Sequence, residues 1–109
     1  MDNPALMNYA DYSDPAVMRK LLRAYDSLYD RACRGDQTAA AVYVDIKSAL
    51  YGEGVLTKRQ RQCIILHLVY KTPQVEASEM LGISRRTLRG AVEAGIAHMQ
   101  KFLLPIMYT

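Results

Sequence analysis

Apolar residues recur along most of the chain at the three- and four-residue spacings of an amphipathic helix, and they nowhere alternate as in a strand. The first such pattern follows Asp14-Pro15, where an aspartate suited to capping free amides precedes a proline suited to the first helical position. It predicts one long amphipathic helix that stops at Gly35. Its apolar positions are Val17, Met18, Leu21, Leu22, Tyr25, Leu28, Tyr29 and Ala32.

Four more helices are predicted further along the chain. Thr57 and Gln60 have the spacing of a capping box, and the long apolar run behind them predicts a mostly buried helix. We therefore expect a mainly α fold of about five helices. The four helices are expected from Asp36 to Gly52, from Thr57 to Tyr70, from Thr72-Pro73 to Leu81-Gly82, and from Ser84 towards Leu104, with Pro105 ending the last one.

The stretch before the first helix, residues 1–13, has no clear period. It is either an ordered arm or a loose terminus, because tyrosines such as Tyr9 and Tyr12 are unusual in a fully disordered segment. The whole chain is expected to divide into an amino-terminal helical segment (1–54), a helix-turn-helix module (55–104) and an apolar tail (105–109).

The last two predicted helices carry the chemistry. A short helix, a tight turn at Gly82 and a second helix capped by Ser84, with arginines in its first two turns, form a helix-turn-helix pattern. The DNA major groove admits one helix, and an arginine fork near the start of that helix donates two hydrogen bonds to guanine. Leu88, Val92, Ile96 and Met99 share one face and are expected to pack inward, so the expected base-facing residues are Arg85, Arg86 and Arg89.

Other donors are candidates for contacts with DNA phosphates. Free amides and hydroxyls at a helix start suit a phosphate, and basic side chains nearby position a protein on DNA without specifying sequence. The same charges would also suit the solvated face of an ordinary bundle, but the turn, the cap and the clustered arginines favour DNA. The expected phosphate contacts are Ser84, Thr87, Lys58, Arg59, Arg61 and Lys71.

The net charge of +3 on the 109 residues is unevenly distributed. Residues 1–56 hold six Lys and Arg against eight Asp and Glu, a charge of −2, whereas residues 57–109 hold eight against three, a charge of +5. A basic half joined to an acidic half indicates one surface that faces a polyanion and another that is neutral or faces protein.

Three motifs agree with one known family. LTKRQRQCIILHL, EASEMLGIS and RTLRGAV, all within residues 56–92, together resemble region 4 of sigma-70 type RNA polymerase sigma factors. The resemblance implies a helix-turn-helix that reads double-stranded promoter DNA, with RNA polymerase as a further candidate partner. The preceding AAAVYVDIKSAL resembles a helix found before this module in short phage-encoded regulators of the ArpU type. Residues 1–56 are too few and too acidic for the larger sigma region that melts promoters, so a sigma-like regulator is expected rather than a complete sigma factor.

Four residues depart from the family pattern. Ser78 stands at a tightly packed position where alanine is usual, and Pro73 replaces a common capping residue, a role that Thr72 would take. Gly90 stands where the family often has a base-reading side chain, and Gly95 replaces a common alanine. Each glycine within a helix costs about 1 kcal/mol relative to alanine. Because Gly90 leaves one base-facing position of the family without a side chain, we expect this chain not to read a standard promoter element in the standard way.

Several other function classes are not expected. The chain has no phosphate-binding glycine loop or nucleophile elbow, and Asp26 and Asp30 lack a catalytic partner, so we expect no enzyme and no cofactor. Cys63 and His67 are spaced to share a metal, but core packing is the simpler interpretation, and no metal site is expected. Cys33 and Cys63 are interpreted as small buried residues rather than a disulfide. No membrane span or secretory signal is apparent, which favours a cytoplasmic protein.

The amino-terminal segment leaves two alternatives open. Its first helix either packs on the helix-turn-helix as core, or joins the apolar tail in a surface for self-association or for RNA polymerase. A homodimer would read half-sites about one DNA turn apart. The apolar residues in question lie in the tail and just before it, and they are Leu103, Leu104, Ile106, Met107 and Tyr108.

The sequence thus predicts a sequence-specific DNA-binding transcription regulator, sigma-70 region 4-like and of phage type. Two alternatives have different partners. One is an interaction protein that binds RNA polymerase or a sigma factor without binding DNA, and the other is a DNA-recognition subunit of a phage packaging machine.

Overall fold

The computed structural model describes residues 11–107, which fold into six α-helices and one π-helical segment with no strand among them. The mainly α fold class is thereby confirmed. The expectation for an arm or loose terminus falls mostly on residues 1–10, including Tyr9, which lie outside the described residues. The elements are α2 (Pro15–Arg23), α3 (Tyr25–Cys33), α4 (Gln37–Tyr51), α5 (Lys58–Ile64), the π-helix η2 (Ile65–Val69), α6 (Gln74–Leu81) and α7 (Arg85–Met107).

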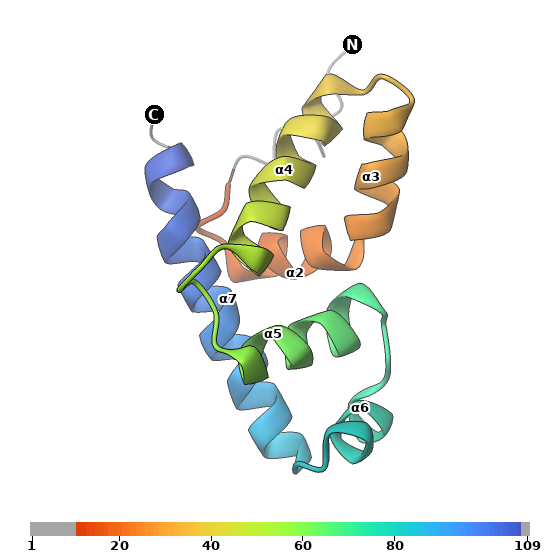
Figure 1. Cartoon of the computed structure of the whole chain (residues 1–109), viewed down its shortest axis with the longest axis vertical. Coiled ribbons are helices and arrows are strands. Elements are labelled where there is room, and N and C mark those ends of the chain that lie inside the picture. Colours follow the sequence, from red (N-terminus) through yellow and green to blue (C-terminus); the bar gives the residue numbers. More distant parts are fainter. Residues whose placement is uncertain (1–10, 108–109) are drawn as a thin grey trace.

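The prediction of one long helix from Asp14 to Gly35 is wrong, because the chain breaks at Ala24. Ala24 has φ −92° and ψ 9°, and α3 leaves α2 in a different direction (Figure 1). The break lets α2 pack on α7 and η2 while α3 packs along α4. Periodicity continues through the break because each half keeps its own apolar stripe, so burial of two stripes against different partners overrides local helix propensity.

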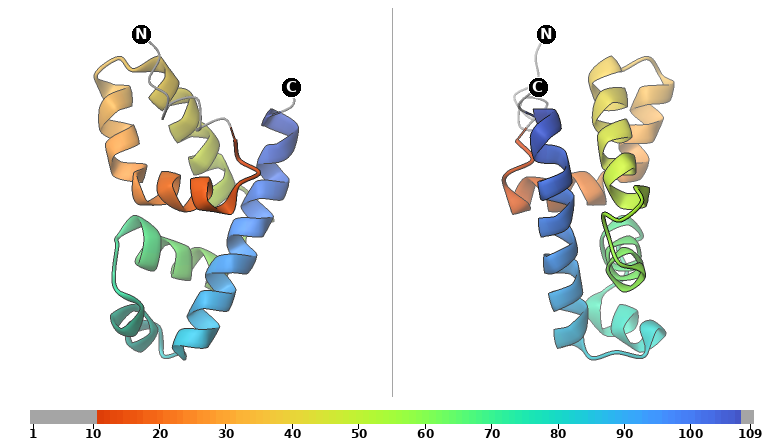
Figure 2. Two further views of the ribbon diagram at one scale, coloured as in Figure 1. Left: turned by 180° about the vertical axis from the view of Figure 1, so that it is seen from behind. Right: turned by 60° about the vertical axis from the view of Figure 1, so that its left-hand side comes forward.

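Helix α7 runs along one side of the molecule and contacts both halves of the chain. In Figures 1 and 2 it extends from the turn after α6, past α5 and α2, to the end of the molecule where α4 begins. Its contacts with α2, α4, α5 and α6 confirm the packing of the amino-terminal segment on the helix-turn-helix.

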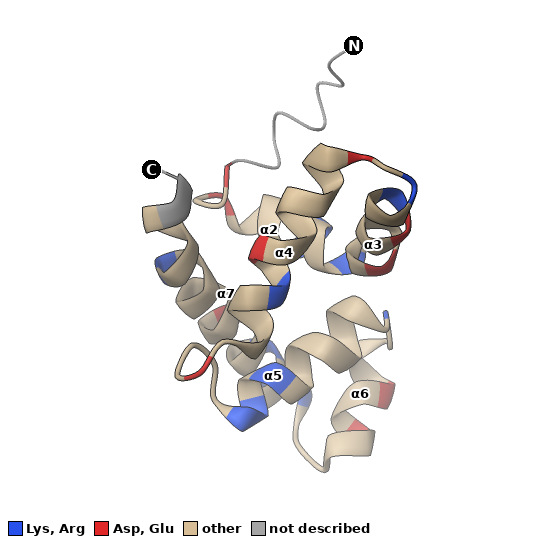
Figure 3. Cartoon of the chain, turned by 45° about the horizontal axis from the view of Figure 1, so that its top comes forward, with Lys and Arg blue, Asp and Glu red and all other residues tan. Residues whose placement is uncertain are grey.

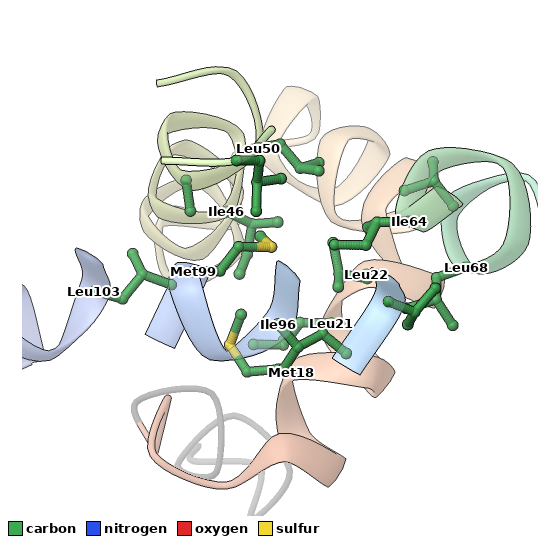
Figure 4. Packing of buried hydrophobic residues seen from close by; sticks show 14 of the residues in the cluster. Met18, Leu21, Leu22, Ile46, Leu50, Ile64, Leu68, Ile96, Met99 and Leu103 are labelled. Atoms are coloured by element: carbon green, nitrogen blue, oxygen red, sulfur yellow. The ribbon is translucent and has the colours of Figure 1, made fainter. Parts of the chain in front are cut away.

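One continuous apolar core joins these helices. Figure 4 shows side chains from α2, α4, α5, η2 and α7 meeting in this core, among them Leu22 beside Ile64 and Leu68. The predicted inward face of α7 is confirmed, since Leu88, Val92, Ile96 and Met99 are all buried. Leu103 is also fully buried, so this residue belongs to the core and not to the surface considered for self-association.

Most predicted helix caps are present. Asp14 accepts a hydrogen bond from the Ala16 amide at 2.8 Å, Asp36 accepts one from Ala39 at 3.0 Å, and Thr57 forms the full capping box with Gln60. These bonds satisfy amides that have no partner inside their helix.

Two helix ends differ from the predictions. Pro73 rather than Thr72 is the N-cap of α6, and no side chain caps this helix. Pro105 lies inside α7, which continues to Met107, so it does not end the helix. The fixed φ of proline is itself helical, so the backbone of α7 can continue through Pro105 although proline has no amide to donate.

The predicted third helix, Thr57 to Tyr70, changes its hydrogen bonding halfway. After Ile64 it becomes the π-helix η2, and the Tyr70 amide donates to the Ile65 carbonyl five residues earlier at 2.8 Å. The wider turn alters which side chains face the core. Spacing of apolar residues does not distinguish this turn from an α-helical one.

The segment before α2 is attached to two distant helices. The Tyr12 hydroxyl donates to Asp45 of α4 at 2.7 Å, and the Gln100 side chain of α7 donates to the Tyr12 carbonyl at 2.9 Å. Burial and the neighbouring Asp45 carboxylate raise the pKa of Tyr12, so its hydroxyl remains a donor. Residues 11–14 are thus held against the core.

The two cysteines differ in environment. Cys63 is fully buried as predicted, and burial raises the pKa of its thiol. Cys33, the last residue of α3, is exposed, so the prediction of a buried residue is wrong there. Both thiols are free. No helix in the described range is long and apolar enough to cross a membrane.

The two glycines inside α7 have opposite surroundings. A Cβ at Gly95 would lie 2.5 Å from Ile64 Cδ1 and 3.3 Å from Gln60 Cβ, whereas a Cβ at Gly90 would meet no atom within 4 Å. Gly95 therefore permits the close approach of α5 to α7. Packing thus explains why residue 95 is glycine rather than alanine, whereas it does not explain the glycine at position 90.

These surroundings predict opposite effects of two alanine substitutions. Gly90→Ala is expected to raise the free energy of unfolding by about 0.5–1 kcal/mol, because alanine restricts the unfolded chain and favours a helix. Gly95→Ala gains the same roughly 0.5–1 kcal/mol from helix propensity, but crowding against the fully buried Ile64 costs about 1–3 kcal/mol, so a net loss of stability is expected. Urea denaturation followed by circular dichroism compares the two variants. Equal stabilisation by both would contradict the close packing of α5 on α7.

Candidate nucleic-acid interface

A tight turn connects α6 to α7. Gly82 adopts φ 67° and ψ 34°, the left-handed conformation that glycine enters without a Cβ penalty. The Ile83 amide donates to the Ser78 carbonyl at 3.0 Å and the Gly82 amide to the Glu79 carbonyl at 3.2 Å, the bond pair of a Schellman motif. The turn predicted at Gly82 is present, and these bonds fix the direction in which α7 leaves α6.

Ser84 caps the start of α7 as predicted. Its hydroxyl accepts a hydrogen bond from the Thr87 amide at 3.0 Å and donates to the Thr87 hydroxyl at 2.9 Å. Both side chains are exposed. The first amides of a helix have no partner inside it, and a helix start favours an anion. The structure therefore presents two hydroxyls and a helix N-terminus on one exposed surface.

The three arginines of α7 lie at this same end. Arg85, Arg86 and Arg89 are exposed, whereas Leu88 between them is fully buried. The helix consequently presents its guanidinium groups away from the face that packs in the core. Gly90 beside them is exposed and adds no side chain to this surface.

The remaining basic residues fall into two groups. Lys58 and Lys71 are exposed, at the first residue of α5 and in the loop before α6. Arg59 donates to the Leu81 carbonyl at 3.4 Å, and Arg61 donates to the Leu50 carbonyl at 2.7 Å. Both arginines therefore tie α5 to the C-terminal ends of neighbouring helices, where a positive charge is favourable.

Lys71 has an unusual backbone. Its φ of 60° is in the left-handed region, which side chains other than glycine rarely adopt. Hydrogen bonds on either side hold this turn, from the Thr72 amide to the Leu66 carbonyl at 3.1 Å and between His67 Nδ1 and the Thr72 carbonyl at 2.8 Å. Since the carbonyl accepts, the His67 ring donates from Nδ1.

Charge is unevenly distributed over the helices of this region. Figure 3 shows Lys and Arg on α5 and acidic residues on the neighbouring α6. The α6 carboxylates are Glu76 and Glu79, both exposed. The exposed cations therefore lie on α5 and at the start of α7, whereas α6 is acidic. We call Lys58, Arg59, Arg85, Arg86 and Arg89 the basic surface.

Ser78 shows how one departure from the family pattern is accommodated. Its side chain is buried, and its hydroxyl donates to the Val75 carbonyl one turn earlier at 2.9 Å. A buried hydroxyl with a hydrogen-bond partner avoids the cost of an unsatisfied polar group. Serine is therefore compatible with the packed position.

Three polar residues near Arg89 were not identified as functional from the sequence. Arg19, His67 and Gln74 line a small pocket together with Arg89. They come from three different elements, and only the packing of α2 against α7 brings Arg19 to this region. In the sequence, Arg19 is an ordinary polar position of an amphipathic helix, so no signal marks it.

The two residues considered for a metal have other structural roles. Cys63 is buried in the core, and His67 is half-buried with its Nδ1 bonded to the Thr72 carbonyl. Within the described range no group of three or more His, Cys, Asp and Glu side chains is placed to hold a metal ion.

Comparison with known proteins identifies one family. Residues 54–101 match the family model described as Sigma-70, region 4. This segment includes α5, η2, α6 and most of α7, and it contains the turn, the cap and the exposed arginines. No curated protein and no solved structure gives a significant match to the chain.

Proposed function

We propose that this chain, whose residues 54–101 form a DNA-binding helix-turn-helix of the sigma-70 region 4 family, is a sequence-specific transcription regulator of phage type. The observation that carries the proposal is the group of exposed arginines at the capped start of α7. In this function the start of α7 enters the major groove, and Arg85, Arg86 and Arg89 face the bases.

The same proposal assigns the positioning contacts. Ser84 and Thr87 hydroxyls, with the amides at the start of α7, suit one phosphate, and the exposed Lys58 and Lys71 suit others. Arg59 and Arg61 stay in the proposed set although each donates to a carbonyl. A guanidinium has five N–H donors, so one such bond leaves others for a phosphate.

A salt titration on random-sequence duplex DNA tests the proposal. If several lysines and arginines neutralise phosphates, the logarithm of the affinity falls linearly with the logarithm of the salt concentration, by about 0.9 per phosphate contact. Fluorescence anisotropy of labelled duplex gives this slope. An affinity that does not change with salt would reject DNA binding.

Lys58→Ala is expected to weaken binding to every duplex by the same factor and to reduce the salt slope by about one unit, because a phosphate contact carries no sequence information. Lys47→Ala, at another exposed lysine on α4, is the matched control and should leave the slope unchanged. A loss confined to one sequence would instead assign Lys58 to a base.

One observation favours a second candidate function, binding to RNA polymerase. A groove of about 330 Å³ is lined by the apolar side chains of Ile65, Leu66, Tyr70 and Leu81 together with Lys58, Arg61 and Gln62. Tyr70, which lines this groove, is 69% exposed and so is available for contact with another protein. Capture of RNA polymerase in the presence of nuclease, lost in Tyr70→Ser, would support this function independently of DNA.

A further inference from the structure

A small polar pocket lies between the amino-terminal segment and the helix-turn-helix. Its volume is about 50 Å³, and its walls come from four elements that are far apart in the sequence. Its lining residues are Arg19 from α2, His67 from η2, Gln74 from α6, and Arg89, Val92 and Glu93 from α7.

The charged groups of the pocket favour an anion. Two basic residues, Arg19 and Arg89, and one acidic residue, Glu93, line the pocket. Neither arginine forms an ion pair with a carboxylate in the part of the chain that the structure describes. Arg19 is half-buried, so its charge acts in surroundings partly shielded from water. Guanidinium groups of this kind form their strongest hydrogen bonds with carboxylate or phosphate oxygens.

The polar neighbours and the size narrow the ligand further. Gln74 is the first residue of α6, whose N-cap Pro73 has no side chain that can accept the amides of the first turn. The His67 ring is held in place by its bond to the Thr72 carbonyl. One water needs about 10–15 Å³ of such space, so the pocket accommodates the oxygens of a single phosphate group but not a nucleotide. A phosphate that belongs to a polymer outside the pocket fits these limits.

We propose that Arg19 binds one phosphate of the DNA backbone in this pocket, beside Arg89 of the helix that enters the groove. The inference rests on the proposed function, and it makes α2 part of the DNA interface although α2 lies outside residues 54–101. The amino-terminal segment then contributes to DNA affinity directly, in addition to covering the core.

The experiment compares two charge-removing substitutions on the same helix. Arg19→Gln and Arg23→Gln remove the same charge, but Arg23 is exposed and does not line the pocket. On random-sequence duplex, R19Q is expected to lower the salt slope by about 0.9 and the affinity by about eightfold at 0.1 M salt, as loss of one phosphate contact requires. R23Q is expected to keep the slope of the wild-type protein.

The outcomes separate this inference from the proposed function. If the wild-type protein binds DNA with a salt-dependent affinity and R19Q keeps the wild-type slope, the role of Arg19 is wrong and the proposed function stands. If the wild-type protein shows no salt-dependent binding, the proposed function itself fails. Because Arg19 is half-buried, R19M, which keeps an aliphatic chain of similar length, decides the matter if R19Q lowers helix content. A normal slope for R19M would overturn the inference.

Discussion

Arg85→Ala is expected to lower the affinity for the preferred duplex by about fivefold to 150-fold, because a bidentate arginine–guanine pair contributes about 1–3 kcal/mol of discrimination. Arg85 is the first residue of α7, follows directly on the capping Ser84, and is exposed. A side chain at this position reaches base edges when the helix start enters the major groove. The effect should therefore concern recognition rather than folding.

The measurement for Arg85 begins with selection of bound duplexes from a random pool by the wild-type protein. Anisotropy titrations of the variant then compare the selected duplex with a scrambled one, and the variant should lose most of the difference between them. Lys101→Ala is the matched control, since Lys101 is an exposed cation on the same helix, more than four turns away. Equal losses on both duplexes would show that Arg85 contacts phosphate instead. Symmetry in the selected sequences would also indicate a homodimer.

Leu22→Ala is expected to destabilise the whole chain by about 2–5 kcal/mol, the usual cost of removing a fully buried leucine side chain. Leu22 belongs to α2, yet it is 0% exposed and lies in the core beside residues of α5 and η2 (Figure 4). Removing its side chain opens a cavity between the amino-terminal segment and the helix-turn-helix. Because the apolar cluster is continuous, we expect a single unfolding transition at lower denaturant.

Urea denaturation by circular dichroism, repeated with duplex DNA present, measures this effect. Arg23→Ala, at the next residue of α2, is the control and should change the free energy of unfolding by less than about 0.5 kcal/mol because its side chain is exposed. Two separate transitions, with only the first shifted by Leu22→Ala, would mean that residues 54–101 fold without the amino-terminal segment.

The helix-turn-helix was the most predictable part of the structure. The caps Thr57 and Ser84 and the turn at Gly82 depend on hydrogen bonds between residues close in sequence. The inward positions of α7 follow from a spacing that any helix imposes. The exposed arginines could therefore be placed correctly before any tertiary contact was known.

Other features depended on distant contacts. The break at Ala24 reflects the separate partners of α2 and α3, and the change to a π-helix after Ile64 involves no residue type that signals it. Arg59 and Arg61 resembled free phosphate contacts, yet each donates to a carbonyl at the end of another helix. Gly95 resembled a weak point of α7, but a Cβ there would lie 2.5 Å from Ile64 Cδ1 of α5.

The sequence by itself determined the helical class, most helix boundaries and the location of positive charge at the start of α7, because caps, turns and amphipathic periods act within one or two turns of backbone. Only the tertiary structure showed that Arg59 and Arg61 donate hydrogen bonds to carbonyls of neighbouring helices. It alone also placed Arg19 of α2 in the same pocket as Arg89 of α7. Which helices become neighbours depends on how the whole chain buries its apolar surface. A pattern of residues close in sequence does not determine this burial.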